Sequence, residues 1–110
     1  MEQQQFSDKI TRQLAVGEQG NMAIYHLKKG AIVPEHKHSQ EQFTYIQAGK
    51  VKVIAGDKTY IVKSGEVLVI PGNVLHSFEA LEDTIDIDFF APKREQEWLD
   101  GTSPFLQNSR

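Results

Sequence analysis

Short runs of alternating apolar and polar residues, interrupted by glycine, asparagine, aspartate and proline, make up residues 10–92. Such alternation is typical of β-strands with one buried face, and the interruptions are typical of the turns between them. The regular spacing predicts an all-β sandwich or barrel in which two sheets bury one face each. About eight strands are expected, within residues 9–16, 21–27, 42–47, 50–55, 59–63, 66–70, 76–81 and 84–90.

The length and composition indicate one globular domain, residues 1–110, with a β-barrel core at about 10–92 and a tail over 93–110. The tail begins with KREQEWLDG, whose good helix formers and closing glycine predict a short helix or turn. The 12 basic and 15 acidic residues form no long run of either sign, so neither nucleic acid nor a membrane is expected as a partner. There is no cysteine, and the first residues, MEQQQFSDKI, lack the apolar core of a signal peptide, so a cytoplasmic location is expected.

Two of the four histidines stand one residue apart in the stretch PEHKHSQEQF. If the chain is extended there, His36 and His38 point to the same face and their imidazoles can reach one point. Gln42, at the start of the next apolar run, can add an amide oxygen, and His76, after the turn PGNVL, can add a third imidazole nitrogen. These donors suit one divalent transition metal (Ni, Zn, Mn, Fe or Co) better than Ca or Mg. Surface histidines are the alternative interpretation, and Glu41 is an alternative to Gln42, although strand parity favours the amide.

The spacing of these residues resembles the two sequence motifs of the cupin superfamily. The first motif, G(X)5HXH(X)3-4E(X)6G, matches from Gly30 to Gly49, with glutamine at its glutamate position. The second motif, G(X)5PXG(X)2H(X)3N, matches Gly65, Pro71 and His76. The resemblance implies a jelly-roll barrel, the double-stranded β-helix of cupins, with the metal at its histidines.

Two departures from the motifs bear on the chemistry. Asn73 occupies a glycine position of the second motif, and asparagine can adopt the left-handed turn that glycine provides. Gln42 occupies the glutamate position of the first motif, which removes one negative charge from the donor set. A divalent ion held by neutral donors attracts anionic ligands and is a stronger Lewis acid, which favours polarisation of a substrate oxygen over oxygen chemistry.

The last apolar run, TIDIDFF, has two different faces. One face holds Asp86, Asp88 and Phe90, and the other holds two isoleucines and Phe89. An isolated sandwich would bury the apolar face and leave the aspartates in water. If Asp88 instead faces a metal pocket, the apolar face needs a cover that a second subunit can supply, so this alternative predicts a homodimer. Arg94, just past the strand, can hold a substrate carboxylate by two hydrogen bonds.

A closer resemblance runs from about Thr11 to Gly101 and rests on HKHSQEQ and ALEDTIDIDFFAPKREQEWLDG. These stretches look like the small cupins of pectin and alginate breakdown, which ketonise unsaturated monouronates. In that family three histidines and a glutamine bind the metal, and a D-x-F-x-x-x-R pattern supplies the catalytic residues, here Asp88, Phe90 and Arg94. The resemblance implies a non-redox enzyme that opens and tautomerises a small acidic sugar without an organic cofactor. A cupin dioxygenase and a metal-bearing binding or sensor module are the alternative functions.

Overall fold

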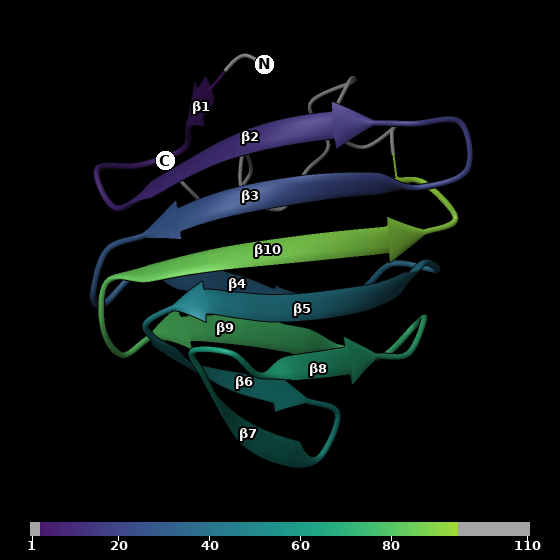
Figure 1. Ribbon diagram of the computed structural model, residues 1–110. Helices are drawn as coiled ribbons and strands as arrows, with labels where there is room; N and C mark the ends of the chain where they lie inside the picture. The colour runs from purple at the N-terminus through teal and green to yellow at the C-terminus, as the bar shows by residue number, and fades with distance from the viewer. Residues whose placement is uncertain (1–2, 95–110) are drawn as a thin grey trace.

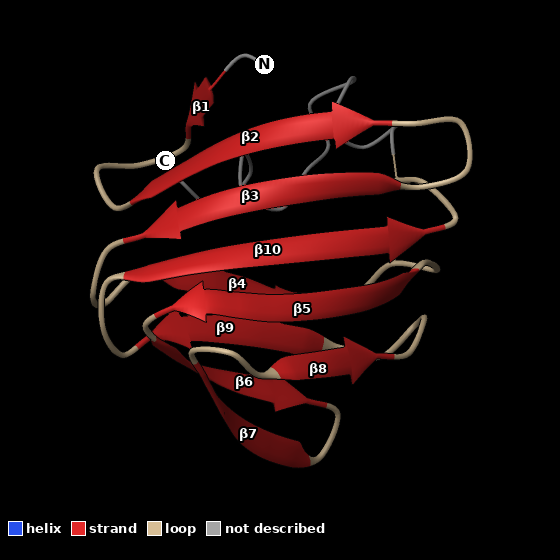
Figure 2. Cartoon of the chain, viewed as in Figure 1, coloured by secondary structure: helices blue, strands red, loops and turns tan. Residues whose placement is uncertain are grey.

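The computed structural model describes residues 3–94, and every helix or strand assigned there is a β-strand (Figure 2). The strands are β1 (Gln3–Gln5), β2 (Ile10–Val16), β3 (Asn21–Leu27), β4 (Ile32–His36), β5 (Glu41–Ala48), β6 (Lys50–Ala55), β7 (Lys58–Lys63), β8 (Val67–Ile70), β9 (His76–Ala80) and β10 (Thr84–Ala91). The predicted all-β class is confirmed. The helix or turn expected in the tail lies outside the described residues, apart from its first two positions. None of the described chain forms a helix long and apolar enough to cross a membrane.

Two of these strands, β1 and β4, were not expected from the sequence pattern. Strand β1 consists of three glutamines, so it has no alternation, and it pairs with β2 at the edge of its sheet. Strand β4 contains Pro34, which cannot donate a hydrogen bond to a neighbouring strand. Proline is tolerated there because β4 is also an edge strand, and its pairing with β9 is irregular between Val33 and His36.

The strands form two antiparallel sheets that face each other (Figure 1). The six-stranded sheet has the order β1-β2-β3-β10-β5-β8, and the four-stranded sheet behind it has the order β4-β9-β6-β7. Strand β10, the last in the chain, pairs along most of its length with β3 on one side and β5 on the other. Its central position places residues from both halves of the chain beside one another.

The apolar core lies between the sheets and takes alternate residues from each strand. On β6, Val51 and Val53 are fully buried, whereas Lys52 between them is not. Ile46 of β5 and Ile70 of β8 are also fully buried. Burying such a side chain stabilises the fold by about 1.5–3 kcal/mol, so these residues determine which face of each strand points inward.

Strand β10 turns its acidic face into the barrel. Asp86, Asp88 and Phe90 are buried, whereas Phe89 is 40% exposed on the outer face. The arrangement common in isolated sandwiches, with the apolar face of TIDIDFF buried and the aspartates in water, is therefore wrong for this strand. Two carboxyl groups in a protein interior cost stability unless they are hydrogen-bonded or paired, which points to a polar site inside the barrel.

Candidate metal centre

Three histidine side chains meet where β4 ends and β9 begins. His36 is the last residue of β4, His76 is the first residue of β9, and the two are paired in the register of these strands. His38 lies in the loop after β4, not on an extended strand as expected, yet its ring centroid lies 5.0 Å from that of His76. One ring nitrogen from each histidine can be chosen so that all three lie within 4.8 Å of one another. Such a cluster can hold a metal ion.

Each of the three imidazoles is oriented by a backbone carbonyl two residues away along the chain. The distance from Nδ1 to the carbonyl oxygen is 2.8 Å for His36 and His76 and 3.0 Å for His38. Because a carbonyl only accepts hydrogen bonds, Nδ1 carries the proton in His36 and His76, and Nε2 keeps its lone pair. His38 has an acceptor at each ring nitrogen, the carbonyl of Gln40 at Nδ1 and the amide oxygen of Gln42 at Nε2, so its Nε2 offers a lone pair in the tautomer that is protonated on Nδ1. The buried Nε2 of His76 has no hydrogen-bond partner among the described residues, which fits an atom that binds a metal.

Gln42 adds an amide oxygen to this cluster. Its Oε1 lies 3.1 Å from Nε2 of His38, and its Nε2 donates to the hydroxyl of Thr44 at 2.9 Å. With His38 protonated on Nδ1, two lone pairs face each other, an arrangement that a cation between them would stabilise. Glu41 is exposed on the opposite side of β5, which agrees with the expectation that parity favours Gln42. The donors therefore fit a divalent transition metal, although their assignment as ligands stays a prediction.

The turn after β8 holds the loop that carries His38. The N–H of Asn73 donates to the carbonyl oxygen of His38 at 2.7 Å. A side chain on Gly72 would place its Cβ 2.3 Å from the carbonyl oxygen of Ser39, so only glycine allows this approach. Asn73 has the left-handed conformation predicted for it, with a φ of 65°. The turn of the second motif thus packs directly on the loop of the first.

Burial keeps the three imidazoles neutral at pH 7. It lowers the pKa of His36 to about 4 and that of His38 to about 3, and the charge of Arg94 adds to both shifts. Burial is also the main cause of the lowered pKa of His76. Since a metal binds the neutral imidazole, the cluster is in its binding form over most of the physiological pH range.

Two buried carboxyl groups lie beside the histidines. Burial raises the pKa of Asp88, opposed by hydrogen bonds from Asp86 and from Thr44 and by the positive charge of Arg94. The Oγ1 of Thr44 donates to Oδ1 of Asp88 at 2.8 Å. Burial and the neighbouring Asp88 raise the pKa of Asp86 well above its usual range. Asp86 is accordingly the protonated member of the pair and Asp88 accepts its hydrogen bond.

Phe90 and Arg94 complete the group of residues predicted to be catalytic. The guanidinium of Arg94 lies 5.1 Å from the centroid of the Phe90 ring, and that ring lies 5.4 Å from the ring of His38. The backbone N–H of Arg94 donates to Oδ1 of Asn21 at 2.8 Å, which fixes the chain where it leaves β10. A cavity of about 20 Å³, room for an ion or a water molecule, is lined by side chains that include His36, Gln42, Asp88, Phe90 and Arg94. All the residues predicted for the site are therefore neighbours, while their roles stay predictions.

Sequence reasoning did not find three further polar residues of the interior. Thr44 follows Gln42 by two positions, so strand parity could have placed it on the same face. Arg12 and Tyr25 are buried and hydrogen-bonded to each other, and Arg12 also bonds Gln4 through Nε at 2.9 Å. Nothing in the alternating pattern of β2 distinguishes such an arginine from an exposed one. The fourth histidine, His26, is exposed and borders a separate depression of about 510 Å³.

Together, these features define a class of protein: a small antiparallel β-barrel with a buried histidine cluster that can hold a metal ion. The chain belongs to the cupin family, since the family model described as "Cupin domain" matches residues 23–91.

Three similar proteins show what this cupin is related to. It is 32% identical over 94 residues to the pectin degradation protein KdgF of Dickeya dadantii strain 3937, covering 83% of this chain and 86% of the relative. Its fold is similar to the structure of KdgF from Halomonas sp., with a TM-score of 0.81, 25% identity, and coverage of 87% of this chain and 90% of that one. It is also similar in fold to Bacillus subtilis oxalate decarboxylase, a protein with Mn(II) centres, with a TM-score of 0.75, 21% identity, and coverage of 83% of this chain and 27% of that one.

Proposed function

We propose that this cupin is a metal-dependent, non-redox enzyme that converts a 4,5-unsaturated monouronate into its linear keto form. The observation that carries the proposal is a neutral donor set, three imidazoles and one amide, next to the buried Asp88 and Arg94. The similarity to a pectin degradation protein supports an acidic sugar as the substrate.

One divalent transition metal ion, Ni, Zn, Mn, Fe or Co, would be held by His36, His38, Gln42 and His76. Because these donors are neutral, the bound ion would keep its full double positive charge and polarise carboxylate or ring oxygens of the substrate. A neutral donor set also lacks the anionic ligand that helps to stabilise a higher oxidation state, which supports non-redox chemistry over dioxygen chemistry.

Asp88 is proposed as the residue that moves the proton. Ring opening moves a proton from the hydroxyl on C1 to the ring oxygen and breaks the bond between C1 and that oxygen, which leaves an aldehyde at C1 and an enol at C5. The enol then loses its hydroxyl proton and gains a proton on C4, so the reaction is a balanced isomerisation. A carboxylate whose pKa is raised by burial is better matched to accepting and returning a proton near neutral pH than an exposed one.

Arg94 is proposed to bind the substrate carboxylate and Phe90 to form the wall of the pocket. A guanidinium can donate two parallel hydrogen bonds to a carboxylate, and its position over the Phe90 ring restricts its orientation. A monouronate is larger than the cavity of about 20 Å³. Binding of the substrate therefore requires side chains that line this cavity to move.

The test uses unsaturated galacturonate and the metal-loaded protein, with the loss of ultraviolet absorbance of the conjugated double bond as the readout. We expect Asp88→Asn to lower kcat by about 100-fold or more, the range found for lost acid-base catalysis, when variant and wild type are compared at equal metal content. Arg94→Lys should mainly raise KM, and Asp57→Asn, in the exposed β6–β7 turn, is the control for charge. No acceleration over buffer would exclude this substrate. Substrate-dependent oxygen uptake would instead indicate a dioxygenase, and ligand binding without product a binding module.

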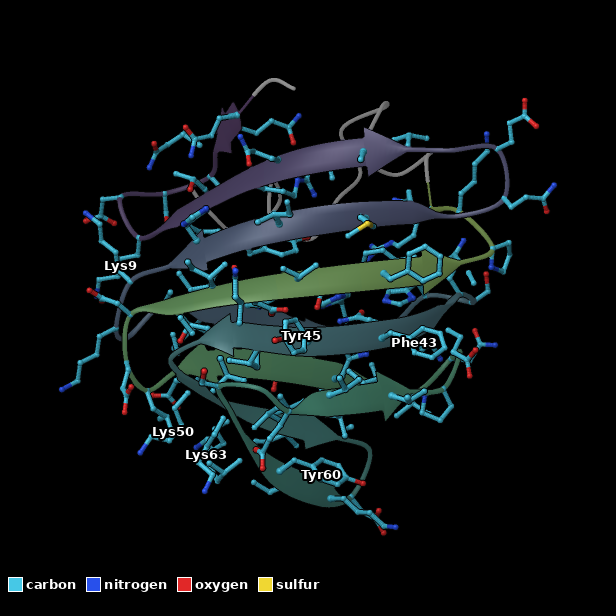
Figure 3. The ribbon with its side chains drawn as sticks, viewed as in Figure 1. Lys9, Phe43, Tyr45, Lys50, Tyr60 and Lys63 are labelled. Atoms are coloured by element: carbon cyan, nitrogen blue, oxygen red, sulfur yellow. The ribbon has the colours of Figure 1, made fainter. Side chains whose placement is uncertain are left out.

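We also propose that the cupin is a homodimer that pairs through the outer face of its six-stranded sheet. Adjacent strands place apolar side chains in two rows on that face, and Figure 3 shows Phe43 and Tyr45 on it. By strand register the rows are Met22, Phe89, Phe43 and Val69, and Ile24, Ile87, Tyr45 and Val67. None of the eight side chains is charged, and a second copy of the same face would cover them by a twofold contact.

The homodimer is tested by the molar mass in solution. Sedimentation equilibrium should give twice the mass of the chain, and Tyr45→Lys should shift the protein towards the monomer because it buries a charge in the contact. Ile61→Lys, at an exposed position on β7 of the other sheet, is the control. A wild-type protein that remains monomeric at micromolar concentration would refute this part of the proposal.

A further inference from the structure

Thr44 links the candidate metal centre to the buried carboxylate. It is fully buried on β5, two residues after Gln42, so both side chains point into the barrel. It is also paired with Asp88 of β10 in the strand register. Its hydroxyl therefore lies between the amide of Gln42 and the carboxylate of Asp88.

The direction of both hydrogen bonds of this hydroxyl is determined by Asp88. A carboxylate accepts hydrogen bonds, so the single hydrogen of Thr44 is donated to Oδ1 of Asp88, at an oxygen–oxygen distance of 2.8 Å. The hydroxyl oxygen then has only lone pairs to offer to Gln42. It accepts from Nε2 of Gln42 at 2.9 Å.

This arrangement turns the amide oxygen of Gln42 towards the histidines. Oε1 of Gln42 lies 3.1 Å from Nε2 of His38, and when His38 is protonated on Nδ1, the tautomer that can bind a metal, neither atom has a hydrogen to donate. Rotated by half a turn, the amide would donate its NH2 group to His38 and place its oxygen against the hydroxyl of Thr44. In that tautomer His38 alone would favour the rotated form, whereas the hydrogen bonds of Thr44 favour the observed one.

We propose that Thr44 is a positioning residue of the metal centre, whose hydroxyl, anchored on Asp88, keeps the oxygen of Gln42 turned towards the ion. The inference rests on the metal-binding part of the proposed function and not on any particular substrate. The Gln42 amide also bonds Asp88 directly, so loss of the hydroxyl weakens the orientation without abolishing it.

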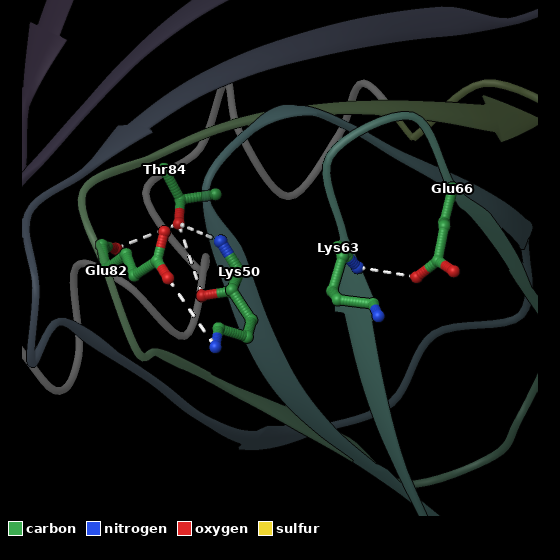
Figure 4. Close-up of polar contacts among 5 residues, drawn as sticks. All are labelled: Lys50, Lys63, Glu66, Glu82 and Thr84. Atoms are coloured by element: carbon green, nitrogen blue, oxygen red, sulfur yellow. Dashed lines mark hydrogen bonds and ion pairs between the residues drawn. The ribbon is translucent and has the colours of Figure 1, made fainter.

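The experiment compares variants that keep or remove the hydroxyl. Thr44→Val keeps the shape and removes the hydroxyl, and Thr44→Ser keeps the hydroxyl. The matched control is Thr84→Val, because Thr84 is also buried but its hydroxyl bonds to Lys50 and Glu82 at the start of β10 (Figure 4). Circular dichroism establishes that each variant is folded, and Thr44→Ala replaces Thr44→Val if that variant does not fold.

Two readouts report on the metal centre without the uronate reaction. The Kd for Zn(II) is measured by competition with a chromophoric chelator, and the visible spectrum of Co(II) reports its ligands. Thr44→Val should raise the Kd by about 10-fold, within the range for lost partners of metal ligands, and should change the Co(II) spectrum. Thr44→Ser and Thr84→Val should resemble the wild type in both.

A double-mutant comparison separates orientation from packing. Glutamate at position 42 has two equivalent oxygens and needs no orienting, so Thr44→Val should raise the Kd less in a Gln42→Glu background than in the wild type. Equal effects in both backgrounds would overturn the proposal, as would wild-type Kd and spectrum for Thr44→Val. If the wild-type protein binds neither Zn(II) nor Co(II), the proposal is overturned together with the metal-binding part of the proposed function.

Discussion

Replacing Asp86 by asparagine should stabilise this protein at neutral pH. Asp86 is only 2% exposed, its Oδ1 has no hydrogen-bond partner among the described residues, and its pKa is raised well above its usual range by burial and by Asp88. The carboxyl is therefore protonated in the folded protein and ionised in the unfolded chain. Asparagine has nearly the same shape, can still donate a hydrogen bond to Asp88, and never ionises.

The size of the effect follows from proton linkage. Above the carboxyl's ordinary pKa of 3.8, the unfolded chain loses a proton that the folded protein keeps. Each pH unit then lowers the free energy of unfolding by up to about 1.4 kcal/mol, until the pH reaches the raised pKa. Over two pH units between the ordinary and the raised pKa, the wild type should lose up to roughly 3 kcal/mol relative to Asp86→Asn. That is a large fraction of the roughly 5–15 kcal/mol that stabilises a typical domain.

Urea unfolding of the metal-free proteins, followed by circular dichroism at several pH values, measures this difference. The prediction concerns its slope: the advantage of Asp86→Asn over the wild type should grow as the pH rises. Asp57→Asn, at an exposed position, removes the same charge without the burial and should track the wild type. Parallel stability curves for Asp86→Asn and the wild type would show that Asp86 is not held protonated by the fold.

Three further outcomes are expected. His76→Ala should lower the metal content from about one ion per chain to well below it, and elemental analysis after dialysis that still finds one ion would contradict the assigned donor set. The metal-free protein should lose stability as the pH falls from 6.5 towards 4. In that range the histidines of the unfolded chain bind protons, whereas the folded-state pKa is only about 4 for His36 and about 3 for His38. His36→Gln should make the free energy of unfolding depend less on pH in acid titrations. Ile46→Ala, in the fully buried core, should lower the free energy of unfolding by about 2–5 kcal/mol, whereas a loss below about 1 kcal/mol would mean that the core collapses around the cavity.

Much of the fold was predictable from local pattern. A period of two with regular turns is a property of each short segment, and it correctly indicated an all-β barrel. The strands it missed, β1 and β4, are held by pairing with a neighbour and not by a pattern of their own. The three glutamines of β1 and the proline-containing β4 have no alternating pattern that predicts a strand. They are extended because an adjacent strand offers hydrogen-bonding partners.

The candidate site divides in the same way. Motif spacing predicted His36, His38, Gln42 and His76 as metal ligands, and the fold does bring these four residues together. The assumption that the chain is extended through His38 was wrong, because the Pro71–Asn73 turn, distant in sequence, packs against the loop that carries it.

By itself, the sequence determined the strand periodicity and the types of the candidate donors, an amide in place of a carboxylate among them, because these depend on the residues and their nearest neighbours along the chain. The tertiary structure decided which face of TIDIDFF is inside, since that depends on β10 lying between β3 and β5 with the histidines opposite. It also placed the hydroxyl of Thr44 between an amide and a carboxylate that are 46 positions apart in the chain. Hydrogen bonds between segments so distant in sequence leave no local signal, and only folding brings their partners within reach.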